Sequence, residues 1–314
     1  MTTSRSFRSL RVRKLRLLIA AVFAISLVLL GIGAYGIVSS HGSAVLPYAI
    51  AFSSSRDDPA KIYIIGEDGS INRLTDGAGT DEDPSWSPDG KRLAFISVQS
   101  GGTVLDVLDG GNLRQVDEPG PLKSTPRWSR DGQQLAYSSP RGVLSVINAD
   151  GSSQRPVFPA ADPAQAEPGC VGGFAGGWLP QGDRILFWGF HAGLMAICSV
   201  KLDGSDARVI FEKADTLNFA PALSPDGSTI AFVSSTGGVN QIYLMNADGT
   251  NPRALLDSQA SDTEPAWSPD GQLIAFASNR DGHYHLYIVK PDGTGLTKLT
   301  EGAVDDRSPT WRPK

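Results

Sequence analysis

The chain repeats one short motif along almost its whole length. In its clearest form the motif reads Pro-x-Trp-Ser-Pro-Asp-Gly, and an apolar segment containing Ala-Phe follows within a few residues. The Trp, or the Leu that replaces it once, stands at positions 86, 128, 178, 223, 267 and 311, so successive copies lie 42, 50, 45, 44 and 44 residues apart. A period of this size is typical of proteins built from repeated structural units.

Each unit is predicted to form four short β-strands. Pro-Asp-Gly makes a tight turn after the first strand, because proline fixes φ, aspartate bonds its own backbone and glycine accepts a positive φ. The second strand is continuously apolar, as in residues 93–96, which indicates that both faces of the sheet are covered. A third strand, such as residues 242–245, leads to an Asp-Gly hairpin turn and a fourth strand. The repeated aspartates are therefore interpreted as turn formers: Asp89, Asp131, Asp226 and Asp270.

The two ends of the repeat array complement each other. Residues 50–53, 62–64 and 73–74 supply the second to fourth strands of a unit that lacks its first strand, and residues 308–313 supply that strand alone. A single sheet of this kind cannot bury both faces, whereas radially arranged sheets can. The sequence therefore predicts an all-β fold, a six-bladed β-propeller of four-stranded blades over residues 48–314, closed by the C-terminal strand joining the first blade.

These repeated elements resemble the TolB-like (WD-like) β-propeller repeat family. The resemblance rests on Pro-x-Trp-Ser-Pro-Asp-Gly, then Ala-Phe, Ile-Tyr and Asp-Gly, and it covers about residues 48–314. No Trp-Asp dipeptide closes a strand, so the repeat differs from the eukaryotic WD type. The resemblance implies a bacterial envelope protein whose propeller face binds a peptide or protein partner. A shared fold alone does not determine an activity.

The N-terminal residues differ in composition from the repeats. Residues 1–16 contain six basic and no acidic side chains, and the 22 residues 17–38 carry no charge. A helix of that length spans the roughly 30 Å hydrocarbon core of a bilayer, with the basic flank on the cytoplasmic side. We expect a cytoplasmic tail (1–16), a transmembrane signal anchor (17–38), a linker (39–47) and an extracytoplasmic propeller, periplasmic or extracellular. A signal peptide cleaved near Gly42-Ser43-Ala44 is the alternative.

The charge of the remaining chain excludes one class of partner. The whole chain has 28 basic and 33 acidic side chains, so removal of the six basic residues in the tail leaves 22 against 33, a charge of −11. Phosphate backbones repel an acidic body. Nucleic-acid binding is therefore not expected.

Acidic residues stand just before the first strands of three neighbouring blades. They are Asp81, Asp83, Asp262, Glu264, Asp305 and Asp306. In a closed ring these loops would gather at one mouth of the central channel, where a cleft focuses the field of its charges. The functional hypothesis is a site for a basic partner segment or for Ca²⁺, and no other cofactor is expected. The alternative is that these are solvated loop charges in an acidic protein.

Cysteine and histidine each form one notable pair. Cys170 and Cys198 both fall in the fourth unit, where an even pair outside the cytoplasm favours a disulfide, although a buried mid-strand Cys198 is equally compatible with the pattern. His283 and His285 would share one face of a strand. Zinc sites need at least three protein ligands, so we interpret the two histidines as a loop and strand-start pair that faces solvent.

The sequence contains no recognisable catalytic signature. Neither a Gly-x-Ser-x-Gly elbow nor a phosphate-binding glycine loop is present. The predicted function is a monomeric, membrane-anchored, non-enzymatic module of the envelope that binds a protein or another ligand. Binding is expected where the loops into the first strands meet connections such as residues 99–102, 235–238 and 280–283. The alternatives are a polysaccharide lyase or hydrolase working at the channel mouth, and an envelope sensor or regulatory protein.

Overall fold

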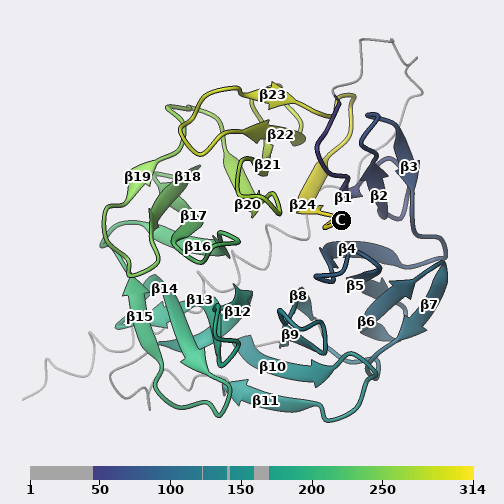
Figure 1. Ribbon diagram of the computed structural model, residues 1–314, viewed down its shortest axis with the longest axis horizontal. Coiled ribbons are helices and arrows are strands. Elements are labelled where there is room, and N and C mark those ends of the chain that lie inside the picture. Colours follow the sequence, from purple (N-terminus) through teal and green to yellow (C-terminus); the bar gives the residue numbers. More distant parts are fainter. Residues whose placement is uncertain (1–44, 122, 140–141, 159–169) are drawn as a thin grey trace, which may run out of the picture. The chain divides into compact units, whose positions relative to one another are not determined.

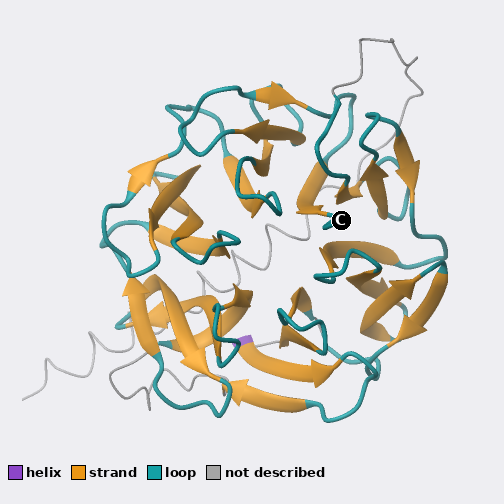
Figure 2. Cartoon of the chain, viewed as in Figure 1, coloured by secondary structure: helices purple, strands orange, loops and turns teal. Residues whose placement is uncertain are grey.

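The computed structural model describes residues 45–121, 123–139, 142–158 and 170–314. These residues form six four-stranded sheets, which are the blades of a ring (Figure 1). Almost all of the regular structure is strand (Figure 2). The predicted six-bladed β-propeller is confirmed. The predicted tail and transmembrane helix, residues 1–38, lie outside the described residues.

The first three blades contain twelve strands. Blade 1 consists of β24 (Asp306–Trp311), β1 (Ile50–Ser54), β2 (Lys61–Ile65) and β3 (Ile71–Arg73). Blade 2 consists of β4 (Thr80–Trp86), β5 (Arg92–Gln99), β6 (Gly102–Asp109) and β7 (Asn112–Gln115). Blade 3 consists of β8 (Ser124–Trp128), β9 (Gln134–Ser139), β10 (Val143–Asn148) and β11 (Arg155–Phe158).

The other three blades repeat the same strand order. Blade 4 consists of β12 (Val171–Trp178), β13 (Arg184–His191), β14 (Leu194–Lys201) and β15 (Arg208–Phe211). Blade 5 consists of β16 (Leu217–Leu223), β17 (Thr229–Thr236), β18 (Val239–Asn246) and β19 (Arg253–Ala254). Blade 6 consists of β20 (Asp262–Trp267), β21 (Ile274–Ser278), β22 (His285–Val289) and β23 (Thr297–Lys298).

The C-terminal strand closes the ring as predicted. Strand β24 pairs antiparallel with β1, with Trp311 opposite Ile50 and Thr310 opposite Ala51. Blade 1 therefore contains four strands although its members come from both ends of the repeat array. Within the described residues, no helix is long and apolar enough to cross a membrane.

The repeated tryptophans pack between neighbouring blades. Four of them donate the indole Nε1–H to a backbone carbonyl of the preceding blade. The bonds are Trp128 to Ser85 (2.9 Å), Trp178 to Arg127 (3.0 Å), Trp267 to Ala222 (3.1 Å) and Trp311 to Ala266 (3.0 Å). These tryptophans therefore act as wedges between neighbouring sheets, and each bond also fixes the spacing of two blades.

The Pro-Asp-Gly turns are held by local hydrogen bonds. In blade 5 the Asp226 carboxylate accepts the Ser224 hydroxyl (2.5 Å) and the Ser228 backbone N–H (3.0 Å). These bonds stabilise the carboxylate and lower the pKa of Asp226 to about 2. Asp89 and Asp131 make the same contacts and have lowered pKa values. The prediction that these aspartates form turns is confirmed.

Arginines join consecutive blades on the side of these turns, a feature that the sequence analysis missed. Each arginine donates to a carbonyl in a turn of the next blade. The bonds with ordinary lengths are Arg312 to Gly90 (2.8 Å), Arg92 to Gly132 (2.8 Å), Arg155 to Leu202 (2.6 Å) and Arg253 to Pro291 (2.8 Å). Arg92 and Arg312 also stack on Trp128 and Trp86, with guanidinium-to-ring distances of 4.5 and 4.9 Å.

Candidate functional site

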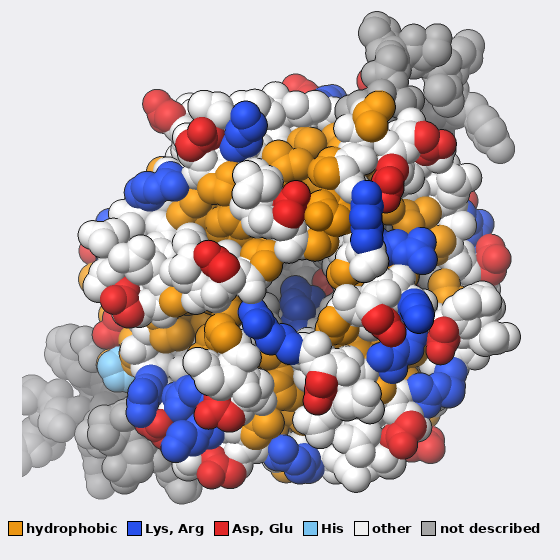
Figure 3. All heavy atoms as spheres, viewed as in Figure 1, with side chains coloured by type: hydrophobic (Ala, Val, Ile, Leu, Met, Phe, Trp, Pro, Cys, Tyr) orange, Lys and Arg blue, Asp and Glu red, His pale blue; other side chains and the backbone are white. Residues whose placement is uncertain are grey.

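The six innermost strands surround a central channel. Each of β24, β4, β8, β12, β16 and β20 contacts the next around the ring. Figure 3 shows the centre of the ring as a hollow in which basic side-chain atoms lie. We call the channel end with the β5–β6 and β17–β18 connections the loop face. The opposite end, which carries the Pro-Asp-Gly turns, is the turn face.

A bulge recurs in the innermost strands three residues before the Trp or Leu anchor. Five non-glycine residues there have φ values between 48° and 56°: Asp83, Thr125, Ala220, Glu264 and Ser308. Pairing with the second strand is interrupted at this point in each of these blades. A bulge changes the direction in which the side chains of its strand point. A non-glycine residue with a positive φ raises the conformational energy of the backbone. The repeat thus places a ring of re-aimed side chains around the channel.

Hydrogen bonds between these bulge residues join four consecutive blades. The Glu264 carboxylate of blade 6 accepts the Ser308 backbone N–H (2.6 Å), and the Ser308 hydroxyl donates to Asp83 of blade 2 (3.1 Å). The second oxygen of Asp83 accepts the Thr125 backbone N–H of blade 3 (3.0 Å). Two of the predicted acidic residues, Asp83 and Glu264, are therefore brought into one network.

The channel also holds charges that this network does not neutralise. Burial, together with the nearby carboxylates of Asp83, Glu264 and Asp81, raises the pKa of Glu82 to about 7. Burial lowers the pKa of Arg127, while the same two carboxylates act in the opposite direction. Arg127 donates to the adjacent Pro126 carbonyl (2.9 Å), and no ion pair joins it to a carboxylate of the described residues. The role of Arg127 does not follow from the sequence, because the charges that act on it come from other blades.

A second arginine of blade 3 crosses the turn face. Arg130 stands where the motif of other blades has proline, and its guanidinium donates to the Pro225 carbonyl of blade 5 (2.8 Å). Blade 4 lies between these two blades, so the side chain bridges part of the turn-face mouth. Arg127 and Arg130 therefore differ in setting, because only Arg130 has its guanidinium bonded to another blade.

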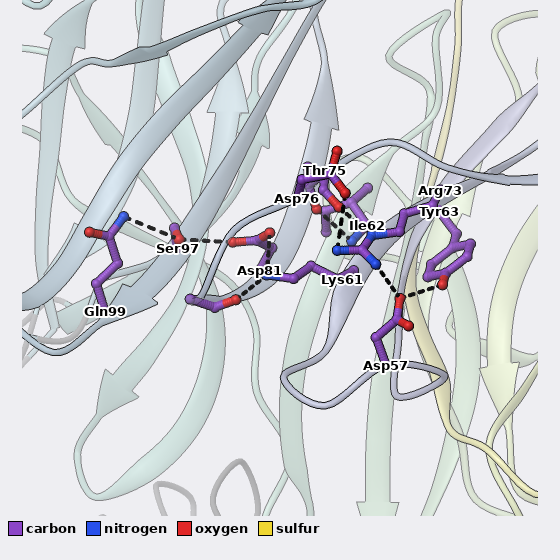
Figure 4. A network of polar contacts seen from close by, with 11 residues as sticks. Asp57, Lys61, Ile62, Tyr63, Arg73, Thr75, Asp76, Asp81, Ser97 and Gln99 are labelled. Atoms are coloured by element: carbon purple, nitrogen blue, oxygen red, sulfur yellow. Dashed lines mark hydrogen bonds and ion pairs between the residues drawn. The ribbon is translucent and has the colours of Figure 1, made fainter.

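The remaining acidic residues of the predicted sector have internal partners. Asp81 accepts the Ser97 hydroxyl (2.8 Å) and pairs with the buried Lys61 (3.3 Å), as Figure 4 shows. Asp306 accepts the Ser54 hydroxyl (2.6 Å) and pairs with Arg56 (2.9 Å).

Asp262 and Asp305 complete the predicted set. Asp262 is 1% exposed and pairs with Arg280 at 3.1 Å. Asp305 accepts the Tyr284 backbone N–H (2.9 Å) and lies 3.6 Å from His283. The structure thus divides the predicted acidic sector into channel residues and inter-strand contacts, and its role in binding stays a prediction.

Blades 1 and 6 contain the same network around one arginine. In blade 1, Arg56 pairs with Asp306 and lies 5.3 Å from the rings of Phe52 and Tyr63, and the Tyr63 hydroxyl donates to Asp57 (2.5 Å). Blade 6 repeats this arrangement with Asp262, Arg280, Phe276, Tyr287 and Asp281. A sequence signal was present, since both blades read Phe-x-Ser-x-Arg-Asp with a tyrosine six residues after the aspartate.

The histidine pair differs from its prediction. His283 is about half exposed, but His285 is 3% exposed and its Nδ1 atom has no hydrogen-bond partner among the described residues. The prediction that both face solvent is wrong for His285, because as the first residue of β22 it lies in the sheet opposite Ser278. Burial lowers the pKa of His285.

Two further features bear on the chemistry of the ring. The structure joins Cys170 and Cys198 in a disulfide, so the alternative of a free buried thiol does not apply to this pair. In the part of the chain that is described, no three His, Cys, Asp or Glu side chains are grouped so that they could hold a metal ion.

Aromatic side chains gather in blades 4 and 5. The Phe174 and Trp188 rings stack with centroids 4.2 Å apart, and Phe219 contacts Trp188 at 6.0 Å. Phe174 and Phe219 stand four residues before the anchors Trp178 and Leu223, the place that Glu82 takes in blade 2. The same position of the repeat therefore carries a carboxylate in blade 2 and an aromatic side chain in blades 4 and 5.

Comparison with known proteins agrees with this architecture. The uncharacterized protein Atu1656 of Agrobacterium fabrum is 26% identical over 185 residues, which cover 58% of this chain and 60% of that protein. The Tol-Pal system protein TolB of Anaeromyxobacter dehalogenans is 32% identical over 85 residues, 27% of this chain and 19% of that protein. The chain thus spans less than two thirds of these curated relatives.

Solved structures share the fold at low identity. TolB from Acinetobacter baumannii has a TM-score of 0.73 and 18% identity, covering 86% of this chain and 68% of that chain. Oligogalacturonate lyase from Vibrio parahaemolyticus has a TM-score of 0.54 and 16% identity, covering 83% of this chain and 76% of that chain. The model of the TolB beta propeller domain matches residues 47–155 and 173–314. Because this match covers most of the chain and includes strands of all six blades, the chain belongs to the TolB beta propeller domain family.

Proposed function

We propose that this protein is a membrane-anchored, extracytoplasmic, non-enzymatic module that binds a polypeptide of the bacterial envelope at the loop face of its channel. Membership of the TolB propeller family supports the module, and the name of one relative, Tol-Pal system protein TolB, connects such propellers with envelope assemblies. The uncharged residues 17–38 and the basic residues before them support the anchor and its orientation.

The charges inside the channel are the observation that carries the proposal. Burial of a charge costs free energy unless a partner compensates it. Asp83 and Glu264 accept hydrogen bonds from other blades, but the guanidinium of Arg127 bonds only its neighbouring carbonyl in the described residues. Blade packing therefore leaves donors of Arg127 for a ligand. An acidic side chain or a backbone carbonyl of a bound polypeptide would supply the acceptor.

A polypeptide fits this site better than a simple ion does. The channel presents a cation, carboxylates and, in blades 4 and 5, aromatic rings, so it offers groups of both charges together with apolar surface. A chain segment presents backbone and side-chain groups that match all three. We also propose that the protein works without catalysis, because its described histidines stand in blades 4 and 6, whereas Arg127 stands in blade 3.

The proposal is tested by comparing two arginines of the same blade. We expect Arg127→Gln to reduce recovery of the crosslinked partner from envelope extract by a factor of at least about 30, since loss of one member of a desolvated charge pair costs roughly 2 kcal/mol or more. Arg130→Gln is the matched control, because it removes an arginine at the turn face. Both variants should keep the circular dichroism spectrum of the unmodified protein. Equal recovery with the two variants would contradict binding through Arg127 in the channel.

A further inference from the structure

Three blades fill one inter-strand position with a tyrosine ring. In each case the ring packs beside a buried phenylalanine of the second strand, which stands directly opposite in the register. The pairs are Phe52–Tyr63, Phe232–Tyr243 and Phe276–Tyr287, with ring centroids 6.1, 5.8 and 5.8 Å apart. In these three blades the repeat therefore accommodates one phenol ring at this position, whereas blade 2 carries Asp106 opposite Phe95.

Blade 3 lacks this tyrosine. The residue opposite its second-strand aromatic, Tyr137, is Ser145. A serine side chain cannot occupy the volume that tyrosine fills in blades 1, 5 and 6, and a cavity of about 540 Å³ adjoins the position. In blade 4 the corresponding residue is Cys198, which is bonded to Cys170. The cavity thus follows from a local departure from the repeat.

The cavity has a buried polar floor and an exposed rim. Tyr137 and Ser145 are 1% and 7% exposed, whereas Pro121 and Gln154 of the lining are exposed. Gln154 and Ser145 both hydrogen-bond with the Tyr137 hydroxyl. Lys123, also in the lining, pairs with Asp117 at 2.6 Å, so its charge is already neutralised. The site is open to solvent and presents hydroxyl and amide groups and the Glu118 carboxylate together with one aromatic ring.

We propose that this cavity is a binding site for small phenols. A phenol would place its ring where the other blades place a tyrosine ring and would direct its hydroxyl to the polar groups of the site. The volume lies within the roughly 300–1,000 Å³ usual for small-molecule pockets. A cavity left by a missing side chain accepts a ligand that resembles that side chain. This site is formed by blade 3 and the preceding connection, so it is independent of the channel.

The probe is p-cresol, which is the side chain of tyrosine as a free molecule. In saturation-transfer NMR on the full chain, we expect p-cresol to bind with a dissociation constant of about 1 mM, as a ligand of eight heavy atoms allows. Ser145→Ala removes the hydroxyl but leaves the cavity, so its affinity should stay within about threefold of the unmodified protein. Ser145→Tyr supplies the missing ring and should weaken binding by at least about tenfold.

Two outcomes decide the proposal. It is supported when p-cresol binds to the unmodified protein and to Ser145→Ala but not to Ser145→Tyr. It is overturned when p-cresol does not bind, or when all three proteins bind it equally. Thermal unfolding checks that Ser145→Tyr is folded. Ser145→Leu is a second, smaller filling variant that should also weaken binding, and it gives the same decision if the tyrosine variant unfolds.

Discussion

Glu82 shows how the channel changes the chemistry of a single residue. Its pKa is raised to about 7 by burial and by the carboxylates of Asp83, Glu264 and Asp81. Since the folded pKa exceeds the unfolded value, folding favours the protonated form. The stability that this form contributes is complete below the unfolded pKa and is lost as the pH rises through about 7.

The first prediction follows from that titration. Glu82→Gln stays neutral at every pH, so its free energy of unfolding should gain about 1–3 kcal/mol relative to the unmodified protein between pH 5 and pH 8. Urea unfolding at the two pH values measures the difference. An equal difference between the two proteins at both pH values would show that Glu82 ionises freely.

His285 gives a prediction in which stability changes with pH in the opposite direction. Burial and Lys298 lower its pKa, and His283 adds to the effect, while Asp281 and Asp305 oppose it. The stability contributed by the neutral ring is present above the unfolded pKa and is lost as the pH falls through the lowered folded value. We expect His285→Leu to reduce the loss of stability between pH 7.5 and pH 5 by about 1 kcal/mol.

The control for this prediction stands two residues away. His283→Leu removes a histidine that is about half exposed, so it should leave the pH dependence almost unchanged. Urea unfolding of both variants at the two pH values provides the comparison. If the two variants respond alike, burial of His285 is not the cause of the acid sensitivity.

The sequence predicts the role of a residue when its partners lie close to it in the chain. The role of Asp226 is set by Ser224 and Ser228, two residues away on either side, so the motif alone predicts the turn. The burial of His285 depends on the packing of the sheet around it, and the pairing of Asp81 with Lys61 joins two blades. Such contacts do not follow from spacing within one repeat.

At the scale of the strand and blade, blade 4 departs from the repeat because a disulfide bond joins two of its segments. The disulfide joins Cys170, which precedes β12, to Cys198 in β14, with Cα atoms 6.4 Å apart and a sequence separation of 28. The bond therefore ties the residue directly before the innermost strand β12 to the third strand β14. In blades 1 and 6 the third-strand position of Cys198 is taken by Tyr63 and Tyr287. Each of these tyrosines donates a hydrogen bond to an aspartate.

Loss of this bond should destabilise the protein. We expect the double variant Cys170→Ser/Cys198→Ser to lose about 3 kcal/mol in free energy of unfolding, the usual contribution of a disulfide that closes a loop of this length. Urea unfolding measures the change. A reductant should produce a similar loss in the unmodified protein and none in the variant, and equal stability of both oxidised proteins would contradict this account.

The blades also show where an element-level signal was overlooked. Phe-x-Ser-x-Arg-Asp occurs in blades 1 and 6 and marks the Arg56 and Arg280 networks. This second repeat lies outside the Trp and Asp-Gly positions that define the blades, so the propeller motif alone does not reveal it. The arginine bonds between blades, such as Arg155 to Leu202, carry no comparable motif because the acceptor is a backbone carbonyl.

At the scale of the whole molecule, the architecture could be predicted almost completely. A recurring interval of 42 to 50 residues between anchors predicts the number of blades, and the incomplete units at residues 50–74 and 308–313 predict the closure that pairs Trp311 with Ile50. The content of the channel could not be predicted in the same way. It depends on the bulges that re-aim Asp83 and Glu264, and on Arg127 approaching them from a third blade.

The central claim is that a polypeptide partner binds at the loop face of the ring. The most direct measurement places a photo-crosslinking amino acid at one of two exposed threonines of blade 5, Thr236 beside the β17–β18 connection or Thr250 in a turn at the opposite end. We predict a specific adduct with an envelope protein from position 236, reduced by Arg127→Gln, and none from position 250. Adducts from position 250 alone, or equally from both positions, would contradict the claim.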